Sequence, residues 1–184
     1  MELVQPIRDR EQIEKVKQIL KAKNTRDYLL FVFGINSALR IGDLLPLRKR
    51  DVIDGRVVIK EEKTGKRKEF PLNDAIKEIL KDYLPTLADD EFLFKSRQAN
   101  RNGDKVISRQ QAYTILTKAF KAAGIKENCG SHTMRKTYGY WNYKKYKDVA
   151  KLQKVLNHSA PSVTLRYIGI DQEEIDKMYE DFEL

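Results

Sequence analysis

The sequence predicts a mainly α-helical protein with a small three-stranded antiparallel β-sheet, which is an α+β fold. Apolar residues recur every three or four positions over much of the 184 residues, a spacing typical of amphipathic helices. Between residues 52 and 70 the pattern changes to short β-branched runs separated by turn-forming pairs. No repeat, low-complexity tract or linker interrupts the chain, so we expect a single domain over residues 1–184.

The N-terminal part of the chain predicts two helices. Residues 13–20 carry apolar side chains on one helical face, which indicates a first amphipathic helix. Thr25 is a suitable N-cap for a second helix. Residues 28–33 are apolar all round, so we expect this second helix to be buried and to continue toward Arg40.

The following segment predicts the three strands. Residues 52–53 and residues 57–59 are β-branched, and Asp54-Gly55 between them favours a hairpin turn. Thr64-Gly65 favours a second turn, followed by a return strand through Phe70.

The middle of the chain predicts two more helices with clear boundaries. Asn73 is expected to open a helix that Pro85 helps to close, and residues 92–94 indicate a short strand. Ser108 and Gln111 form the pattern of a capping box, and Gly124 is expected to end that helix.

Three helices are expected toward the C-terminus, over residues 132–146, 148–156 and 161–168. Asp148 is suited to cap the second of them. Asn157 follows its end, where a left-handed residue is often needed and asparagine adopts that conformation readily. This turn would fix the direction in which His158 points.

The charge of the chain indicates a nucleic-acid partner without proving it. Lys and Arg total 36 and Asp and Glu total 27, so the net charge is +9. Cations placed on phosphates release condensed counterions, so basic proteins are typical nucleic-acid binders. A well-solvated surface with surplus lysine explains the same net charge, and the last dozen residues are acidic.

Other function classes are excluded more firmly. No apolar run is long enough to span a membrane and no signal peptide is recognisable, so we expect a cytoplasmic protein. Cys129 is the only cysteine, so no internal disulfide can form. Cys129, His132 and His158 lack a fourth partner for zinc, and no metal or other cofactor is predicted.

The two histidines mark the candidate site. His132 and Arg135 share one helical face, so an imidazole and a guanidinium can approach the same phosphate oxygens. His158 is followed nine residues later by Tyr167. Two arginines from separate segments, Arg40 and Arg135, would clamp a phosphodiester.

Taken in order, these motifs resemble the catalytic domain of the tyrosine recombinases, the phage integrase family of site-specific DNA recombinases. Residues 38–45 resemble the first arginine box, and residues 62–66 resemble the hairpin that carries the family's lysine. Residues 131–137 resemble the His-x-x-Arg box. Residues 156–158 with Tyr167 resemble the final histidine and the nucleophile.

The resemblance implies a role for each residue. Tyr167 would attack the scissile phosphate to form a 3′-phosphotyrosyl link, and Lys63 would protonate the departing 5′-oxygen. His132 would assist as an acid or base on the tyrosine side. The catalytic set implied is Arg40, Lys63, His132, Arg135, His158 and Tyr167. The guanidinium groups and His158 would stabilise the charge on the phosphate oxygens, and the reaction would need neither ATP nor a metal.

Three of these assignments have competing interpretations. Asp43, one helical turn from Arg40, is either a carboxylate that orients an arginine or an ordinary surface charge. Lys63 competes with Lys60, Lys66 and Lys68 on the same hairpin, and is preferred because it precedes Thr-Gly. Tyr167 competes with other tyrosines, and its position three residues after a threonine favours it. Those other tyrosines are Tyr138, Tyr140, Tyr143 and Tyr146.

The chain also departs from the family pattern. Ala38 and Asn157 stand where glycine is common, and Asp43 stands where glutamate is common. Family members usually carry a helical core-binding domain and often an arm-binding domain, and we expect this chain to lack both. The chain would then be an excised catalytic domain or a naturally minimal member.

The C-terminal segment has apolar residues at helical spacing, namely Ile175, Met178, Tyr179 and Phe182. In the family such segments dock on a neighbouring protomer, which implies a tetramer on double-stranded DNA. Docking on the same chain fits the pattern equally well.

The sequence therefore predicts an enzyme that cleaves and rejoins DNA strands during integration or excision of mobile DNA. One alternative is a non-catalytic DNA-binding regulator that retains the fold. A second alternative is a type IB topoisomerase, which relaxes supercoiled DNA by the same chemistry and needs no second DNA site.

Overall fold

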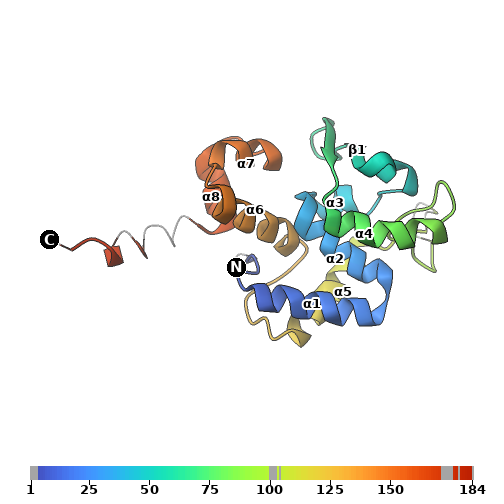
Figure 1. Ribbon diagram of the computed structural model, residues 1–184, viewed down its shortest axis with the longest axis horizontal. Helices are drawn as coiled ribbons and strands as arrows, with labels where there is room; N and C mark the ends of the chain where they lie inside the picture. Colours follow the sequence, from blue (N-terminus) through green and yellow to red (C-terminus); the bar gives the residue numbers. More distant parts are fainter. Residues whose placement is uncertain (1–3, 100–102, 104, 171–175, 178, 184) are drawn as a thin grey trace.

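The protein is mainly helical, with one small β-hairpin on its surface (Figure 1). The computed structural model describes residues 4–99, 103, 105–170, 176–177 and 179–183. The elements are α1 (Arg10–Lys23), α2 (Thr25–Ser37), α3 (Ile41–Leu44), η1 (Lys49–Gly55), β1 (Arg56–Lys60), β2 (Arg67–Pro71), α4 (Asp74–Tyr83), η2 (Leu84–Thr86), α5 (Arg109–Ala122), α6 (Thr133–Tyr146), α7 (Val149–Leu156) and α8 (Pro161–Ile168).

Helix α2 is the centre of the main hydrophobic core, as its apolar sequence predicts. It packs against α1, α4 and α6. Its phenylalanines make edge-to-face ring pairs, Phe31 with Phe120 at 6.0 Å between centroids and Phe33 with Phe94 at 6.5 Å. Such pairs add to the free energy gained from burying the rings, so α2 is firmly packed up to the loop that follows it.

The expectation that this second helix continues toward Arg40 is wrong. The helix ends at Ser37 because Ala38 adopts the left-handed conformation, with φ of 57°. Arg40 is extended and is the N-cap residue of α3. At the other end of α2, the side chain of Asn24 accepts a hydrogen bond from the Asp27 amide, so Asn24 is the cap and the predicted cap, Thr25, is the first helical residue.

In the described part of the chain the sheet has two strands rather than the three predicted. Strands β1 and β2 pair antiparallel with Val58 opposite Glu69. Residues 52–53, predicted as a strand, belong to the 3₁₀ helix η1. The Asp51 carboxylate accepts a hydrogen bond from the Arg48 amide at 2.8 Å, a local bond that favours a turn over a strand. Phe92 makes only an isolated bridge with Arg48, so the short strand predicted for residues 92–94 is also absent there.

The predicted helix boundaries from α4 onward are confirmed. The Asn73 side chain accepts a hydrogen bond from the Ile76 amide, and Ser108 and Gln111 form both bonds of a capping box. Gly124 has φ of 80°, which suits the end of α5. The Asp148 side chain caps α7 by accepting from the Lys151 amide at 2.9 Å.

Helices α6, α7 and α8 form a second, smaller hydrophobic cluster beside the main core (Figure 1). Asn157 ends α7 in the predicted left-handed conformation, with φ of 51°. Gly139 of α6 allows α8 to approach closely, because a Cβ placed there would lie 2.6 Å from the Ile168 Cγ2. The buried members of the cluster are Ala38, Tyr140, Tyr143, Leu152, Leu156, Ile168 and Ile170.

The predicted C-terminal amphipathic segment is described only in part. Ile175 and Met178 lie outside the described residues, whereas Tyr179 and Phe182 have large exposed side chains.

Among the residues that the structure describes, no helix has the length and apolar character needed to cross a membrane.

Candidate active site

Arg40 stands at the start of α3, directly after Ala38 of the smaller cluster and Leu39 of the main core. Its carbonyl accepts from the Asp43 and Leu44 amides, which fixes the backbone of this turn. Its Nη1 donates to the Glu61 carboxylate at 3.1 Å. The Asp43 carboxylate lies 3.9 Å from the same nitrogen and accepts from the Glu62 amide at 2.8 Å. Asp43 therefore joins α3 to the hairpin beside the arginine.

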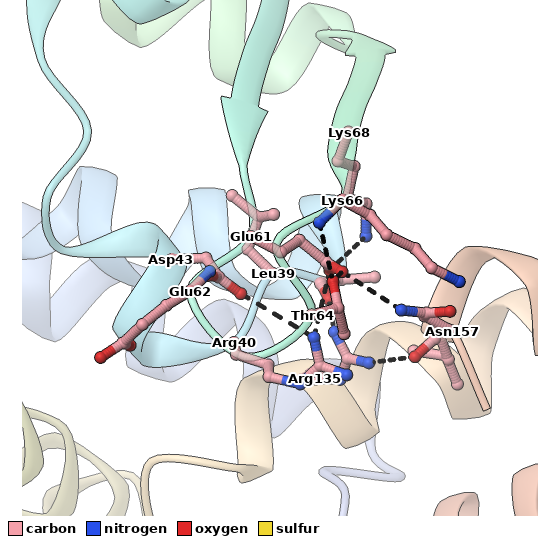
Figure 2. Close-up of polar contacts among 12 residues, drawn as sticks. Leu39, Arg40, Asp43, Glu61, Glu62, Thr64, Lys66, Lys68, Arg135 and Asn157 are labelled. Carbon is pink, nitrogen blue, oxygen red and sulfur yellow. Dashed lines mark hydrogen bonds and ion pairs between the residues drawn. The ribbon is translucent and has the colours of Figure 1, made fainter. Parts of the chain in front are cut away.

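Arg135 is buried in the first turn of α6 and joins the ends of two other helices. Its two terminal nitrogens donate to the carbonyl oxygens of Ala38 and Leu156 (Figure 2). The last carbonyls of a helix have no partner inside the helix. Ala38 and Asn157 are left-handed, so the chain turns away there and leaves both carbonyls facing the guanidinium. Burial lowers the pKa of Arg135, and the charge of Arg40 lowers it further.

The charge of Arg40 lowers the pKa of Arg135, and Figure 2 shows the two guanidinium groups close to each other. The bonds described for them use two of the five N–H donors of Arg135 and one of the five of Arg40. Donors therefore remain on both side chains for an anion.

His158 and Tyr167 are in contact with each other. Their rings meet edge to face with centroids 4.9 Å apart. The His158 Nδ1 lies 3.1 Å from the Thr164 hydroxyl oxygen, which holds the ring in place. Burial lowers the pKa of His158 to about 4, and the positive charges of Arg135 and Arg40 contribute to this shift. The imidazole is therefore neutral at pH 7.

The Tyr167 hydroxyl oxygen is buried beside the Arg135 guanidinium, but no hydrogen bond of standard geometry reaches it from the described residues. Burial raises the pKa of this phenol, while the nearby charges of Arg135 and Arg40 oppose the rise. The Lys136 ammonium lies 5.0 Å from the centre of the tyrosine ring. A buried hydroxyl that lacks a well-aligned partner is costly, and a catalytic role is one explanation for such a group.

His132 and Lys63 lie at the exposed edge of this cluster. His132 precedes the first residue of α6, and Lys63 is in the turn between β1 and β2. Burial lowers the pKa of His132, followed by the charges of Arg135, Lys136, Arg40 and Lys63. The Lys63 ammonium therefore lies within electrostatic reach of the imidazole. Contacts or charge effects thus link all six residues proposed from the sequence.

Sequence reasoning missed the most connected residue of the site, Glu61, which is only 3% exposed. Burial alone would raise the pKa of this carboxyl, but the Thr64 hydrogen bond, the charges of Lys68 and Arg40, and the Asn157 hydrogen bond lower it overall. The alternation of the strand could have predicted that Glu61 is buried. Val57 and Ile59 face inward, and Glu61 is the next residue on the same side of the strand.

Lys68 is a second residue that the sequence pattern does not single out, because three other lysines lie on the same hairpin. Its ammonium donates to the Val155 carbonyl at 3.0 Å and lies 3.9 Å from the Glu61 carboxylate. Burial lowers the pKa of Lys68 to about 8, and the charge of Arg135 adds to the shift.

A metal centre has no support in the described part of the chain. No three His, Cys, Asp or Glu side chains there gather closely enough to hold an ion. The site is instead a cluster of cations around a tyrosine, which is suited to binding an anion such as a phosphodiester.

Comparison with known proteins agrees with this geometry. The chain is 48% identical over 183 residues to a Bacillus subtilis (strain 168) protein described as "Probable integrase/recombinase YoeC", covering 99% of this chain and 98% of that protein. Among solved structures, the XerH site-specific recombinase in a post-cleavage complex with palindromic difH substrate superposes with a TM-score of 0.73 at 20% identity. The match covers 97% of this chain and 53% of XerH.

A lambda integrase tetramer bound to a Holliday junction has the same fold, with a TM-score of 0.69 at 20% identity. The match covers 91% of this chain and 49% of the lambda integrase chain, so this chain spans about half the length of these two solved recombinases. Residues 9–174 match the phage integrase family over most of the chain. The protein is therefore a member of the phage integrase family, the tyrosine recombinases.

Proposed function

We propose that this protein cleaves and rejoins DNA strands through a covalent 3′-phosphotyrosine on Tyr167, in the integration or excision of mobile DNA. The observation that carries the proposal is the contact between His158 and Tyr167 beside two buried or half-buried guanidinium groups. This arrangement offers a nucleophile and an anion site together.

In the proposed reaction the Tyr167 oxygen forms a bond to the phosphorus and the bond to the 5′-oxygen breaks. Arg40, Arg135 and His158 stabilise the charge on the non-bridging oxygens. Lys63 supplies the proton that the 5′-oxygen takes up, and His132 assists removal of the phenol proton. One phosphate ester replaces another, so a second 5′-hydroxyl can reverse the attack and join a different strand.

The environment of Tyr167 indicates that the free protein holds the nucleophile in its protonated form. The pKa of a phenol is about 10 even in water, and burial raises that of Tyr167 further. Arrival of a DNA phosphate between the guanidinium groups would have to coincide with exposure and deprotonation of the hydroxyl. Cleavage is then coupled to binding.

Full strand exchange requires more than one protomer, and we propose a tetramer assembled through the C-terminal segment. The exposed Tyr179 and Phe182 are apolar groups that a neighbouring protomer would cover.

The deciding experiment is the trapping of a covalent adduct. The probe is a pool of nicked suicide duplexes, randomised around the nick, from which the cleaved strand end diffuses away. Wild-type protein should give an adduct that survives SDS, and peptide mapping should place the DNA on Tyr167. No adduct over the whole pool would favour a non-catalytic DNA-binding regulator, and relaxation of supercoiled plasmid by monomers would favour topoisomerase-like activity.

The matched variants are Tyr167→Phe and Tyr138→Phe. Tyr167→Phe should bind DNA and form no adduct, whereas Tyr138→Phe should form it. Because no hydrogen bond of standard geometry reaches the buried Tyr167 hydroxyl, its removal should change the free energy of unfolding by no more than about 1 kcal/mol. An adduct that persists in Tyr167→Phe would assign the nucleophile to another tyrosine.

A further inference from the structure

A single buried carboxylate connects three segments of the candidate active site. One Glu61 oxygen accepts from the Arg40 guanidinium at 3.1 Å. The other accepts from the Thr64 hydroxyl at 2.7 Å and from the Asn157 amide at 3.3 Å. Figure 2 shows Glu61 lying among these three side chains, where the hairpin, the turn before α3 and the end of α7 meet.

Each side chain that donates a hydrogen bond to the Glu61 carboxylate belongs to, or adjoins, a residue with a proposed role in cleavage. Arg40 belongs to the anion clamp. Thr64 follows Lys63 in the hairpin turn, and Asn157 precedes His158 after α7. These segments are far apart along the chain, so their relative positions depend on tertiary contacts such as these.

Glu61 lies beneath the cationic surface rather than in it. Its side chain is 3% exposed, whereas that of Arg40 is 20% exposed. A phosphate arriving from solvent would therefore meet Arg40 first, and the carboxylate would support the guanidinium from behind. Glu61 does not touch the reacting groups and can act only through its neighbours.

The negative charge of Glu61 has a second effect. Arg135 and Arg40 lower the pKa of Lys68 by repulsion, while Glu61 raises it. A buried anion thus offsets the repulsion among cations that must stay close together before DNA binds. Glutamine has the same shape but lacks the charge, and its amide NH₂ would face donors where the carboxylate accepts.

We propose that Glu61 is the positioning residue that holds Arg40, the Lys63 turn and the His158 segment in one arrangement. This inference rests on the proposed function, because it assigns Glu61 an effect on the rate of strand cleavage. The loss of the Glu61 charge should also loosen the hairpin turn and the His158 segment, and this effect can be measured without cleavage.

The kinetic test compares Glu61→Gln with Glu62→Gln in single-turnover adduct formation. Glu62 is the matched control, because its side chain is 65% exposed and pairs with Arg109 on the surface. Glu61→Gln should slow adduct formation at saturating DNA at least tenfold while Kd for the duplex changes less than threefold. Glu62→Gln should change neither quantity. Equal rates in the two variants would overturn the proposal.

A mutant cycle tests whether Glu61 acts through its neighbours. Thr64→Val removes the hydroxyl without changing the shape of the side chain, and Asn157→Gly removes the amide at a left-handed position that glycine tolerates. Each should slow the adduct step, and each should slow it less in the Glu61→Gln background than in the wild type. Fully additive effects would contradict the proposal. The two single variants also test the contacts should Glu61→Gln fail to fold.

A hydrogen-exchange measurement separates this inference from the proposed function. The Gly65 amide donates to the Glu61 carbonyl, and the His158 amide donates to the Gln153 carbonyl. In Glu61→Gln both amides should exchange at least tenfold faster than in Glu62→Gln, with amides of α1 unchanged. If the wild-type protein forms no adduct, the proposed function is refuted. The exchange rates of the Gly65 and His158 amides would still decide whether Glu61 positions these segments. Unchanged exchange at both amides would refute the positioning role.

Discussion

His158 shows how the surroundings of one residue set its protonation state. Burial and the charges of Arg135 and Arg40 lower its pKa to about 4 from an ordinary value of 6.5. Between these values the unfolded chain binds a proton at this residue that the native protein does not. The free energy of unfolding should therefore fall as the pH is lowered from about 6.5 to 4, and this contribution is constant above that range.

Urea unfolding at a series of pH values from 4.5 to 7.5 measures this dependence. In His158→Gln the decline toward acid should be shallower than in the wild type. The pKa of His132 is also lowered, so His132→Gln serves as the comparison. It should remove the contribution of His132 to the pH dependence of the free energy of unfolding and leave that of His158. If the free energy of unfolding of His158→Gln declined with acid as steeply as that of the wild type, the lowered pKa of His158 would be contradicted.

At the scale of elements, the contact between α6 and α8 decides where Tyr167 lies. A methyl group at Gly139 would stand 2.6 Å from the Ile168 Cγ2 and 3.5 Å from the Leu156 Cδ1. Replacing glycine by alanine inside a helix normally gains about 0.5–1 kcal/mol. Overpacking a well-filled core costs about 1–3 kcal/mol, so the clash should prevail.

Gly139→Ala should therefore lower the free energy of unfolding by about 1 kcal/mol and slow adduct formation, because α8 carries Tyr167. Chemical denaturation and the suicide-substrate assay measure the two effects. Adding Ile168→Ala removes the clashing methyl group, so the double variant should lose less stability than the sum of the single variants. Strict additivity would show that the two positions do not interfere.

The left-handed residues of the connecting turns are a second feature at this scale. Ala38 and Asn157 lie 119 residues apart in sequence, yet each turn leaves a carbonyl for Arg135. Local sequence predicted the turn at Asn157, because the helix before it has a clear apolar stripe. It did not predict the turn at Ala38, because residues 28–33 are apolar all round and mark no helix end.

For the whole molecule, the net charge of +9 makes DNA binding a salt-dependent process. The logarithm of the binding constant should fall linearly with the logarithm of salt concentration, with a slope near 0.9 for each phosphate contacted. Lys63→Gln should reduce the slope by about 1 if its ammonium reaches a phosphate. Lys17→Gln is the matched control, because Lys17 pairs with Glu14 at 2.7 Å on α1. Fluorescence anisotropy with a labelled duplex measures both, and equal slopes for the two variants would remove Lys63 from the interface.

The sequence by itself determined the helical class of this protein, most helix boundaries, and the residues to be considered for its site. Helix periodicity and capping depend on neighbours within a few positions, so they can be read along the chain. The tertiary structure decided that the described sheet has two strands, that α2 stops at Ser37, and that Glu61 is buried and Lys68 half-buried among the cations. Those outcomes depend on bonds between segments that are distant in sequence, such as the bond between Arg135 and the Ala38 carbonyl. A local sequence pattern does not show which charged side chains will be buried together.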